Sequence, residues 1–363
     1  MLKHTSKLIA TVTTATLLSS CGSESSTRTT EYSGLNQALS QVITLVVEPA
    51  ATNFLNQARQ LDSLSDAFCS TTTEANLLAV QNQWRATAKS WYELLPYNFG
   101  PMINDEVLPE YIFIDSLRLR GTNYTQTVRN DIDSMLAASS ALTDTMFTNK
   151  NFQFVGLLAT ELAVFERASD HNTEIGNILS DFTTQSRKCQ ILQGYTGQLV
   201  TRAENISNGW SSNYQNTGSS YRNLLLSGDL NQIAGEDSSS TSAKLITSTN
   251  EYMDYVHKRT IINDVAVVSG YTWNLMLAGL ESFERMVEGS AAGTTESFAN
   301  ILEKNAANDL TVIRNNITTT KTAISEQNAT NFYAATLALD GNIKRELKDG
   351  LGIDVGLNFS DGD

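Results

Sequence analysis

The chain contains very little proline, and proline disappears entirely after its first third. The four prolines are Pro49, Pro96, Pro101 and Pro109, in a chain of 363 residues. Proline interrupts helices more strongly than any other residue, so its absence from 110–363 favours long helices. Strand-like alternation with β-branched enrichment is also missing from every long run. The sequence therefore predicts an all-α fold.

Histidine is too scarce for the common hydrolytic sites. The chain has only His4, His171 and His257, and no His-Glu-x-x-His motif. A zinc hydrolase uses about three protein ligands and an open position for water. A Ser/His/Asp arrangement likewise has little histidine to draw on. These shortages argue against an enzyme.

Positive charge is also in short supply. Lys and Arg total 25 against 39 Asp and Glu, which gives a net charge of −14. A strongly acidic chain is a poor ligand for the phosphate backbone. Nucleic acid is therefore excluded as a partner.

The N-terminus has the pattern of a bacterial lipoprotein signal. Lys3 and Lys7 precede a short apolar run, and Leu-Ser-Ser-Cys ends at Cys21. The run is too short for a permanent membrane span. We predict a signal peptide at 1–20, then a lipidated Cys21 and a polar tether over 21–34. An ordinary secretory signal with a chance cysteine is the alternative.

The residues around Cys21 also predict the destination. Gly22, not aspartate, follows the cysteine, so nothing indicates retention at the inner membrane. We expect the chain to be anchored by lipid in the cell outer membrane, on its periplasmic face. With Cys21 lipidated, Cys69 and Cys189 remain, and such a pair in an oxidising compartment predicts a disulfide. Two buried free thiols are the alternative.

One stretch, 152–167, combines an apolar helical pattern with two unusual residues. Gly156 lies where an interior glycine suggests close helix packing or a ligand. Glu161 lies among apolar residues, and a carboxylate there needs a partner, a metal or a proton. The alternative is an ion pair with one of three arginines: Arg85, Arg118 or Arg129.

The segment 96–109 is rich in glycine, proline and aromatic residues. Structured loops of this kind often carry function. We expect Asp105 and Asp115 to face a cleft shared with Glu161. The expected aromatic lining is Trp84, Tyr97 and Phe99. A packed connection between helices is the alternative.

The helical pattern divides the chain into two halves, about 35–170 and 171–350, with an acidic tail over 351–363. Phe-Glu-Arg at 165–167 recurs at 283–285, which suggests an internal duplication of a four-helix-bundle-like unit. We expect Pro49 to kink or divide the first helix. Helices are predicted near 35–68, 75–95, 124–142, 152–167, 178–212, 243–263, 270–288, 295–324 and 328–348.

Several blocks resemble the imelysin-like family. They are Asn-Leu-Leu-Ala-Val-Gln-Asn-Gln-Trp at 76–84, Phe-Gly-Pro at 99–101 and the C-terminal 351–363. Gly-Leu-Leu-Ala-Thr-Glu at 156–161 is similar to the family's Gly-x-His-x-x-Glu motif. The resemblance covers about 35–363. It implies an all-α fold of two bundle-like halves, a periplasmic or outer-membrane location and a link to bacterial iron uptake.

The family was first classed as a metallopeptidase, and its motif His and Glu are the implied metal ligands. Leu158 occupies the His position here, which makes the chain a divergent member. Leucine cannot bind a metal, and Glu161 alone is one hard oxygen donor. The family's Trp-Pro-Asp-like block is also changed, to Phe-Ile-Asp, and keeps only Asp115.

These observations predict a non-enzymatic component of iron uptake that binds a metal, a metal complex or a partner protein. Iron or another divalent metal is the implied cofactor, with Glu161 as its candidate ligand. An iron-transport protein is the implied partner, besides the membrane that holds the lipid. Two alternatives stay open. One is a divergent metallopeptidase, and the other is a structural or protein-interaction lipoprotein without a metal site.

Overall fold

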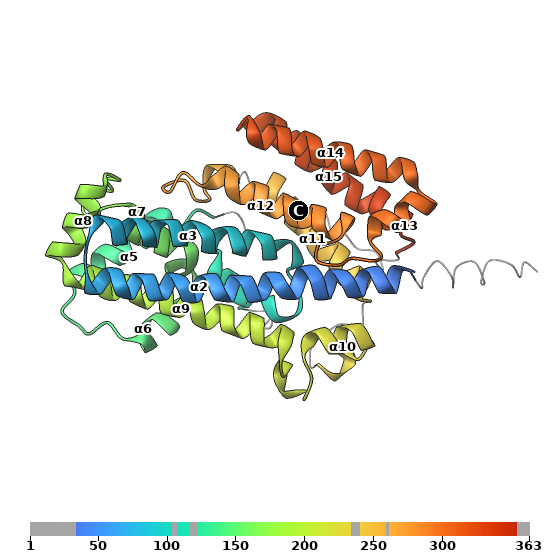
Figure 1. Ribbon diagram of the computed structural model, residues 1–363. Helices are drawn as coiled ribbons and strands as arrows, with labels where there is room; N and C mark the ends of the chain where they lie inside the picture. The colour runs from blue at the N-terminus through green and yellow to red at the C-terminus, as the bar shows by residue number, and fades with distance from the viewer. Residues whose placement is uncertain (1–33, 104–107, 117–121, 234–239, 259–260, 354–363) are drawn as a thin grey trace, which may run out of the picture.

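The computed structural model describes residues 34–103, 108–116, 122–233, 240–258 and 261–353. Every regular element within these residues is helical, which confirms the predicted fold class (Figure 1). The α-helices are α2 (Glu48–Ser70), α3 (Glu74–Leu94), α4 (Glu110–Ile114), α5 (Thr125–Ala137), α6 (Asp144–Thr148), α7 (Gly156–Phe165), α8 (Ile175–Thr184), α9 (Ser186–Ser211), α10 (Tyr221–Ser227), α11 (Thr241–Lys258), α12 (Thr272–Glu288), α13 (Phe298–Asn305), α14 (Ala307–Ser325), α15 (Ala329–Asn342) and α16 (Lys348–Gly350). Short 3-10 helices are η2 (Leu95–Tyr97), η3 (Gly100–Met102), η5 (Phe152–Phe154), η6 (Tyr214–Asn216), η7 (Leu230–Gln232) and η8 (Ile261–Asn263), and π-turns are η1 (Ile43–Val47) and η9 (Ile343–Leu347).

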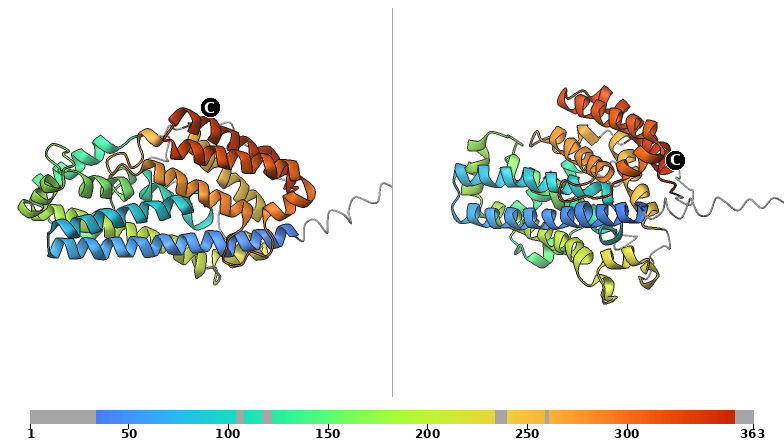
Figure 2. Two further views of the ribbon diagram at one scale, coloured as in Figure 1. Left: turned by 45° about the horizontal axis from the view of Figure 1, so that its top comes forward. Right: turned by 45° about the vertical axis from the view of Figure 1, so that its right-hand side comes forward.

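The helices pack as two groups that share one core. In the first group α2 packs against α3 and α9, and α7 packs against α9 and α3. In the second group α11 packs against α15, and α12 and α15 both pack against α14. Helix α12 also packs on α3, and this contact joins the groups. Both views of Figure 2 show α14 and α15 on the outer side of α12, away from α2.

Pro49 does not divide the first helix, although division was one of the two outcomes predicted for it. The helix is continuous over Gly34–Ser70, and Pro49 lies in the first turn of α2. The π-turn η1 directly precedes it, where the Glu48 N–H bonds the Ile43 carbonyl five residues back. Such a wider turn accommodates the ring and the missing N–H of a proline. By length and composition this helix would pass as a membrane span, but half of its most apolar window is buried inside the protein.

Two predicted helices, 178–212 and 295–324, are each two shorter ones, and the helix predicted over 124–142 ends at Ala137. Helices α8 and α9 are separated only by Gln185, and α13 and α14 only by Ala306. The backbone at these two residues is not helical (φ −127°, ψ 87° and φ −151°, ψ 53°). Neither break contains proline or glycine, so composition alone did not reveal them.

The Cys69–Cys189 disulfide is present, as predicted. It ties the end of α2 to the beginning of α9, with a Cα–Cα distance of 5.5 Å. The alternative of two free thiols is therefore wrong.

The two Phe-Glu-Arg segments have different surroundings. Glu166 follows the end of α7, is buried and pairs with Arg129. Glu284 lies inside α12, about one-third exposed, and pairs with Lys321. Both are structural ion pairs, but the sequence match does not extend to equivalent contacts.

Some predictions concern residues outside the described ranges. These are the signal and lipidation site at Cys21, Asp105, Arg118 and the tail from 354 onward. Within the described residues, Trp84, Trp91 and Trp210 are buried in the core, and Trp273 is partly buried against it.

Candidate functional site

Gly156 places α7 directly against the end of α4. Its φ is +83°, and a Cβ there would lie 2.5 Å from the Ile114 carbonyl oxygen and 2.6 Å from that of Phe113. Only glycine fits both the backbone angle and the close approach. Gly156 is therefore the first residue of α7. The sequence pattern had instead suggested a position inside the helix. The contact brings α7 next to Asp115, the residue after α4.

Glu161 lies in the middle of α7, and it is only 2% exposed. Its Oε1 accepts a hydrogen bond of 2.8 Å from the backbone N–H of Ser269. Burial raises the pKa of Glu161 to about 7, although the hydrogen bonds from Ser269 oppose the shift. A proton is thus available to satisfy this carboxyl near neutral pH.

The alternative of an arginine pair for Glu161 is wrong for the two candidate arginines that the structure describes. Arg129 instead forms a bidentate ion pair with Glu166, with N–O distances of 2.8 and 2.7 Å. Arg85 lies over the Phe165 ring, and its Nη2 is 3.5 Å from the Ser269 carbonyl oxygen.

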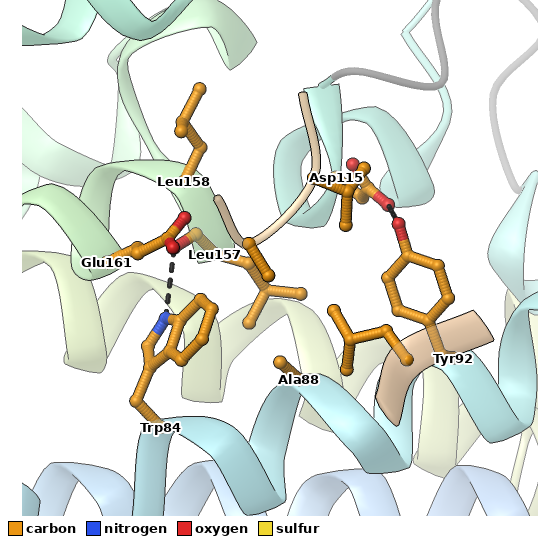
Figure 3. A pocket seen from close by; sticks show the side chains of 10 residues that line it. Trp84, Ala88, Tyr92, Asp115, Leu157, Leu158 and Glu161 are labelled. Atoms are coloured by element: carbon orange, nitrogen blue, oxygen red, sulfur yellow. Dashed lines mark hydrogen bonds between the residues drawn. The ribbon is translucent and has the colours of Figure 1, made fainter. Parts of the chain in front are cut away.

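Asp115 and Glu161 line one small cavity together with Trp84 (Figure 3). Its volume is about 20 Å³, enough for one water molecule. Trp84 Nε1 donates to the Leu157 carbonyl at 3.0 Å, and the Tyr92 hydroxyl donates to Asp115 Oδ2 at 3.2 Å. Burial raises the pKa of Tyr92 well above its usual range, so it remains a donor.

The other predicted lining residues lie elsewhere. The Tyr97 hydroxyl donates to the Ser282 carbonyl at 2.7 Å, and Phe99 packs edge-on against Trp210. Residues 95–102 are buried. This part of the loop is thus the packed connection between helices that was the alternative.

Glu161 also faces a much larger hollow of about 440 Å³. Leu158 and Glu161 line both the hollow and the small cavity, so they form the wall between them. The other lining residues come from the beginning of α5 and from the segment between α11 and α12. They are Asn123, Thr125, Gln126, Arg129, Asn263, Asp264, Val267 and Val268. The hollow has the size of a small-molecule site.

The site does not fit the metal centre that the Gly-x-His-x-x-Glu resemblance implies. Leu158 supplies no donor atom, and no group of three converging metal-ligand side chains in the described residues includes Glu161. Asp115 Oδ2 already accepts from Tyr92, and Asp264 Oδ1 accepts from Asn123 at 2.6 Å. A tight transition-metal site needs about three protein ligands.

A set of buried charges supports the end of α7. Lys188 Nζ donates to the Glu166 carbonyl at 2.9 Å and to Asp181 Oδ2 at 2.5 Å. Burial lowers the pKa of Lys188, and Asp181 opposes the shift. His171 Nδ1 lies 3.4 Å from Glu166 Oε1. Glu166 is thus surrounded by three basic side chains, those of Arg129, His171 and Lys188. Arg129 lies at the edge of the hollow, but its ion pair is with Glu166 and not with the buried Glu161.

Sequence reasoning missed Ser269, Asp264 and Tyr92. Ser269 and Asp264 lie about 100 residues after Glu161 and belong to no motif. Only the packing of the segment between α11 and α12 against α7 brings them to the site.

Comparison with known proteins agrees with this architecture. An imelysin-like protein from Psychrobacter arcticum 273-4 has a similar structure, with a TM-score of 0.67 and 17% identity, over 90% of this chain and 98% of that one. A protein from Parabacteroides distasonis ATCC 8503, named as an iron-regulated protein A precursor, has a TM-score of 0.63 and 14% identity, over 88% and 95% of the two chains. No curated protein matches the chain significantly. The family model for imelysin, a peptidase family by designation, matches residues 47–349. The chain therefore belongs to the imelysin family.

Proposed function

We propose that the protein is a lipid-anchored, non-enzymatic component of iron uptake that holds a small iron complex in the hollow beside Glu161. The observation that carries the proposal is a single buried carboxyl at the wall of a 440 Å³ hollow, without the histidine of the family motif. The name of the Parabacteroides distasonis relative supports the link to iron.

The lining favours a complex over a bare ion. A bare transition ion takes several donor atoms from the protein, and the side chains around Glu161 do not converge on one point. Thr125, Gln126 and Asn263 instead offer a hydroxyl and two amides, which hydrogen-bond to the oxygens of an organic ligand.

Glu161 can hydrogen-bond to a ligand oxygen that accepts, such as a carboxylate, and to one that donates, such as a hydroxyl. With a pKa of about 7, its carboxyl donates a hydrogen bond when protonated and accepts one when ionised. The carboxyl therefore adjusts to a carboxylate or to a hydroxyl on the ligand, and its preference changes across neutral pH.

The binding test uses the mature protein in detergent with ferric citrate and a ferric trihydroxamate as probes, measured by calorimetry. Val267 lies at the hollow and is 51% exposed, so Val267→Trp fills the hollow without changing charge. We expect Val267→Trp and Glu161→Gln to weaken binding, and Glu303→Gln, an exposed control, to leave it unchanged. Equal binding by Val267→Trp, or tighter binding of free Fe³⁺ than of either complex, contradicts the proposal.

The anchor and the absence of catalysis have their own tests. Metabolic labelling with a fatty acid is expected to mark the wild type and not Cys21→Ser, and only the wild type is expected in the outer-membrane fraction. A divergent metallopeptidase would cleave peptides in a reaction that a chelator abolishes. Such cleavage would overturn the non-enzymatic proposal without affecting the anchor.

A further inference from the structure

The strongest unassigned cluster of metal-binding side chains lies in the second group of helices, between α11 and α15. Asp254 and His257 are three residues apart on α11, and Asp340 faces them from α15. One donor atom from each lies within 4.8 Å of the other two. We propose that Asp254, His257 and Asp340 bind a divalent first-row transition-metal ion at a site separate from the Glu161 hollow.

The position of His257 is the first argument. Its Nδ1 lies 2.8 Å from the Met253 carbonyl oxygen. A carbonyl oxygen only accepts, so Nδ1 carries the hydrogen, and Nε2 of the neutral ring has its lone pair available. Metal-binding histidines are held in this way, with one ring nitrogen donating to a carbonyl or carboxylate and the other on the metal. The side chain is only 8% exposed, and Nε2 lies 4.0 Å from Asp254 Oδ1.

The carboxylates supply the second argument. Asp254 Oδ1 is buried and has no hydrogen-bond donor within bonding distance among the described residues. Lys344 Nζ, 3.8 Å away, offsets part of the charge of this oxygen but forms no hydrogen bond with it, so its lone pairs are available to a ligand. The Asp340 side chain is 7% exposed, and its Oδ1 accepts a hydrogen bond from Asn250, which orients it.

The spacing and the donor types define the ion. On one helix, residues i and i+3 point to the same face, so Asp254 and His257 approach the facing helix together. Metal–ligand bonds of about 2.0–2.2 Å require donors somewhat closer than they lie here, so the proposed site forms only when the aspartates rotate toward the ion. One imidazole and two carboxylates suit Zn²⁺, Fe²⁺ or Mn²⁺ better than Ca²⁺ or Mg²⁺, which prefer oxygen alone.

The protein also contains a competing cation. Lys344 Nζ lies 2.9 Å from Asp340 Oδ2 and 3.8 Å from Asp254 Oδ1. Lys258 Nζ lies 2.8 Å from Asp254 Oδ2, at the outer side of the cluster. The Lys344 side chain is 26% exposed, so its ammonium has a path to solvent when a metal ion takes its place. Metal binding therefore displaces Lys344 from the two aspartates.

This competition gives a sharp test with calorimetry and Zn²⁺ on the metal-free mature protein. We expect one Zn²⁺ per chain, with binding weakened more than about tenfold in His257→Gln and in Asp254→Asn. Lys344→Gln is expected to tighten binding about fivefold, because it removes an ion pair of ordinary strength that the metal must displace. Glu161→Gln is the matched control and is expected to bind Zn²⁺ like the wild type.

A second measurement does not depend on how the ligand variants fold. The chain has only three histidines, so its imidazole NMR spectrum is simple. Zn²⁺ is expected to shift the His257 resonances and leave those of His171 in place. The proposal is overturned if neither the wild type nor Lys344→Gln binds Zn²⁺, if the His257 resonances stay unchanged, or if the binding disappears with Glu161→Gln.

Discussion

Replacement of Glu161 by glutamine tests the site through the pH dependence of stability. Glutamine has nearly the same shape, remains neutral at every pH and can still accept the hydrogen bond from the Ser269 N–H. The wild-type carboxyl has a pKa of about 7 when folded, against 4.5 for an ordinary glutamate. One pKa unit corresponds to about 1.4 kcal/mol, so the difference amounts to about 3 kcal/mol.

The sign follows from which state holds the proton more tightly. Below about pH 4.5 the carboxyl is protonated in both states, and its stabilising contribution is complete. As the pH rises towards 7, the unfolded chain loses its proton first while the folded chain retains it. The free energy of unfolding therefore falls by up to about 3 kcal/mol across this window and levels off above the folded pKa. Glu161→Gln lacks this loss, so its stability relative to the wild type increases with pH.

The assay is urea unfolding of the wild type, Glu161→Gln and the exposed control Glu303→Gln, at about pH 4.5 and about pH 8. The stability of Glu161→Gln relative to the wild type is expected to change by about 3 kcal/mol between the two, and that of Glu303→Gln to change little. If the Glu161→Gln difference is the same at both pH values, the pKa of the carboxyl is the same in the folded and unfolded chains and the reasoning fails.

Three further variants test the disulfide, the packing of Gly156 against α4 and the missing histidine at Leu158. Replacing both Cys69 and Cys189 by serine is expected to reduce the free energy of unfolding by about 5 kcal/mol, because the disulfide closes a loop with a sequence separation of 120. A reduction below about 1 kcal/mol in urea titrations would contradict this. Gly156→Ala is expected to cost about 3 kcal/mol, from its positive φ and its overlap with two carbonyl oxygens; an unchanged melting temperature would show that α7 tolerates the shift. Leu158→His places an imidazole one helical turn before Glu161 and is expected to add a second Zn²⁺ site by calorimetry, weaker than a three-ligand site because only two side chains hold the ion, and Glu161→Gln then removes it. Unaltered stoichiometry in Leu158→His would show that the wall of the hollow cannot hold an ion.

The disulfide and the helical class were predictable because each depends on a property of the chain that composition records. Two cysteines remain after Cys21, and the sequence lacks proline over most of its length. The motif at 156–161 also contains Leu158 and Glu161, which line both the small cavity and the hollow. The helix boundaries were less predictable, since Gln185 and Ala306 interrupt helices without being helix breakers themselves.

The structural roles of Gly156 and Glu161 could not be predicted from the sequence. Gly156 was expected inside a helix, but it begins α7 because two carbonyl oxygens of another helix leave no room for a side chain. An arginine pair was the alternative considered for Glu161, yet its hydrogen-bond partner is the backbone N–H of Ser269. The burial of Glu161 raises its pKa, and burial depends on every helix that surrounds it.

The sequence by itself determined the helical class, the paired cysteines and the family, because helix-forming composition, cysteine count and motif blocks are properties of the chain order. Tertiary structure alone decided which groups meet. Packing of the segment between α11 and α12 against α7 placed Ser269 on Glu161 and opened the hollow beside Leu158. Packing of α11 on α15 gathered Asp254, His257 and Asp340. Both sites join residues far apart in the chain, and only the burial of apolar surface between helices brings such residues together.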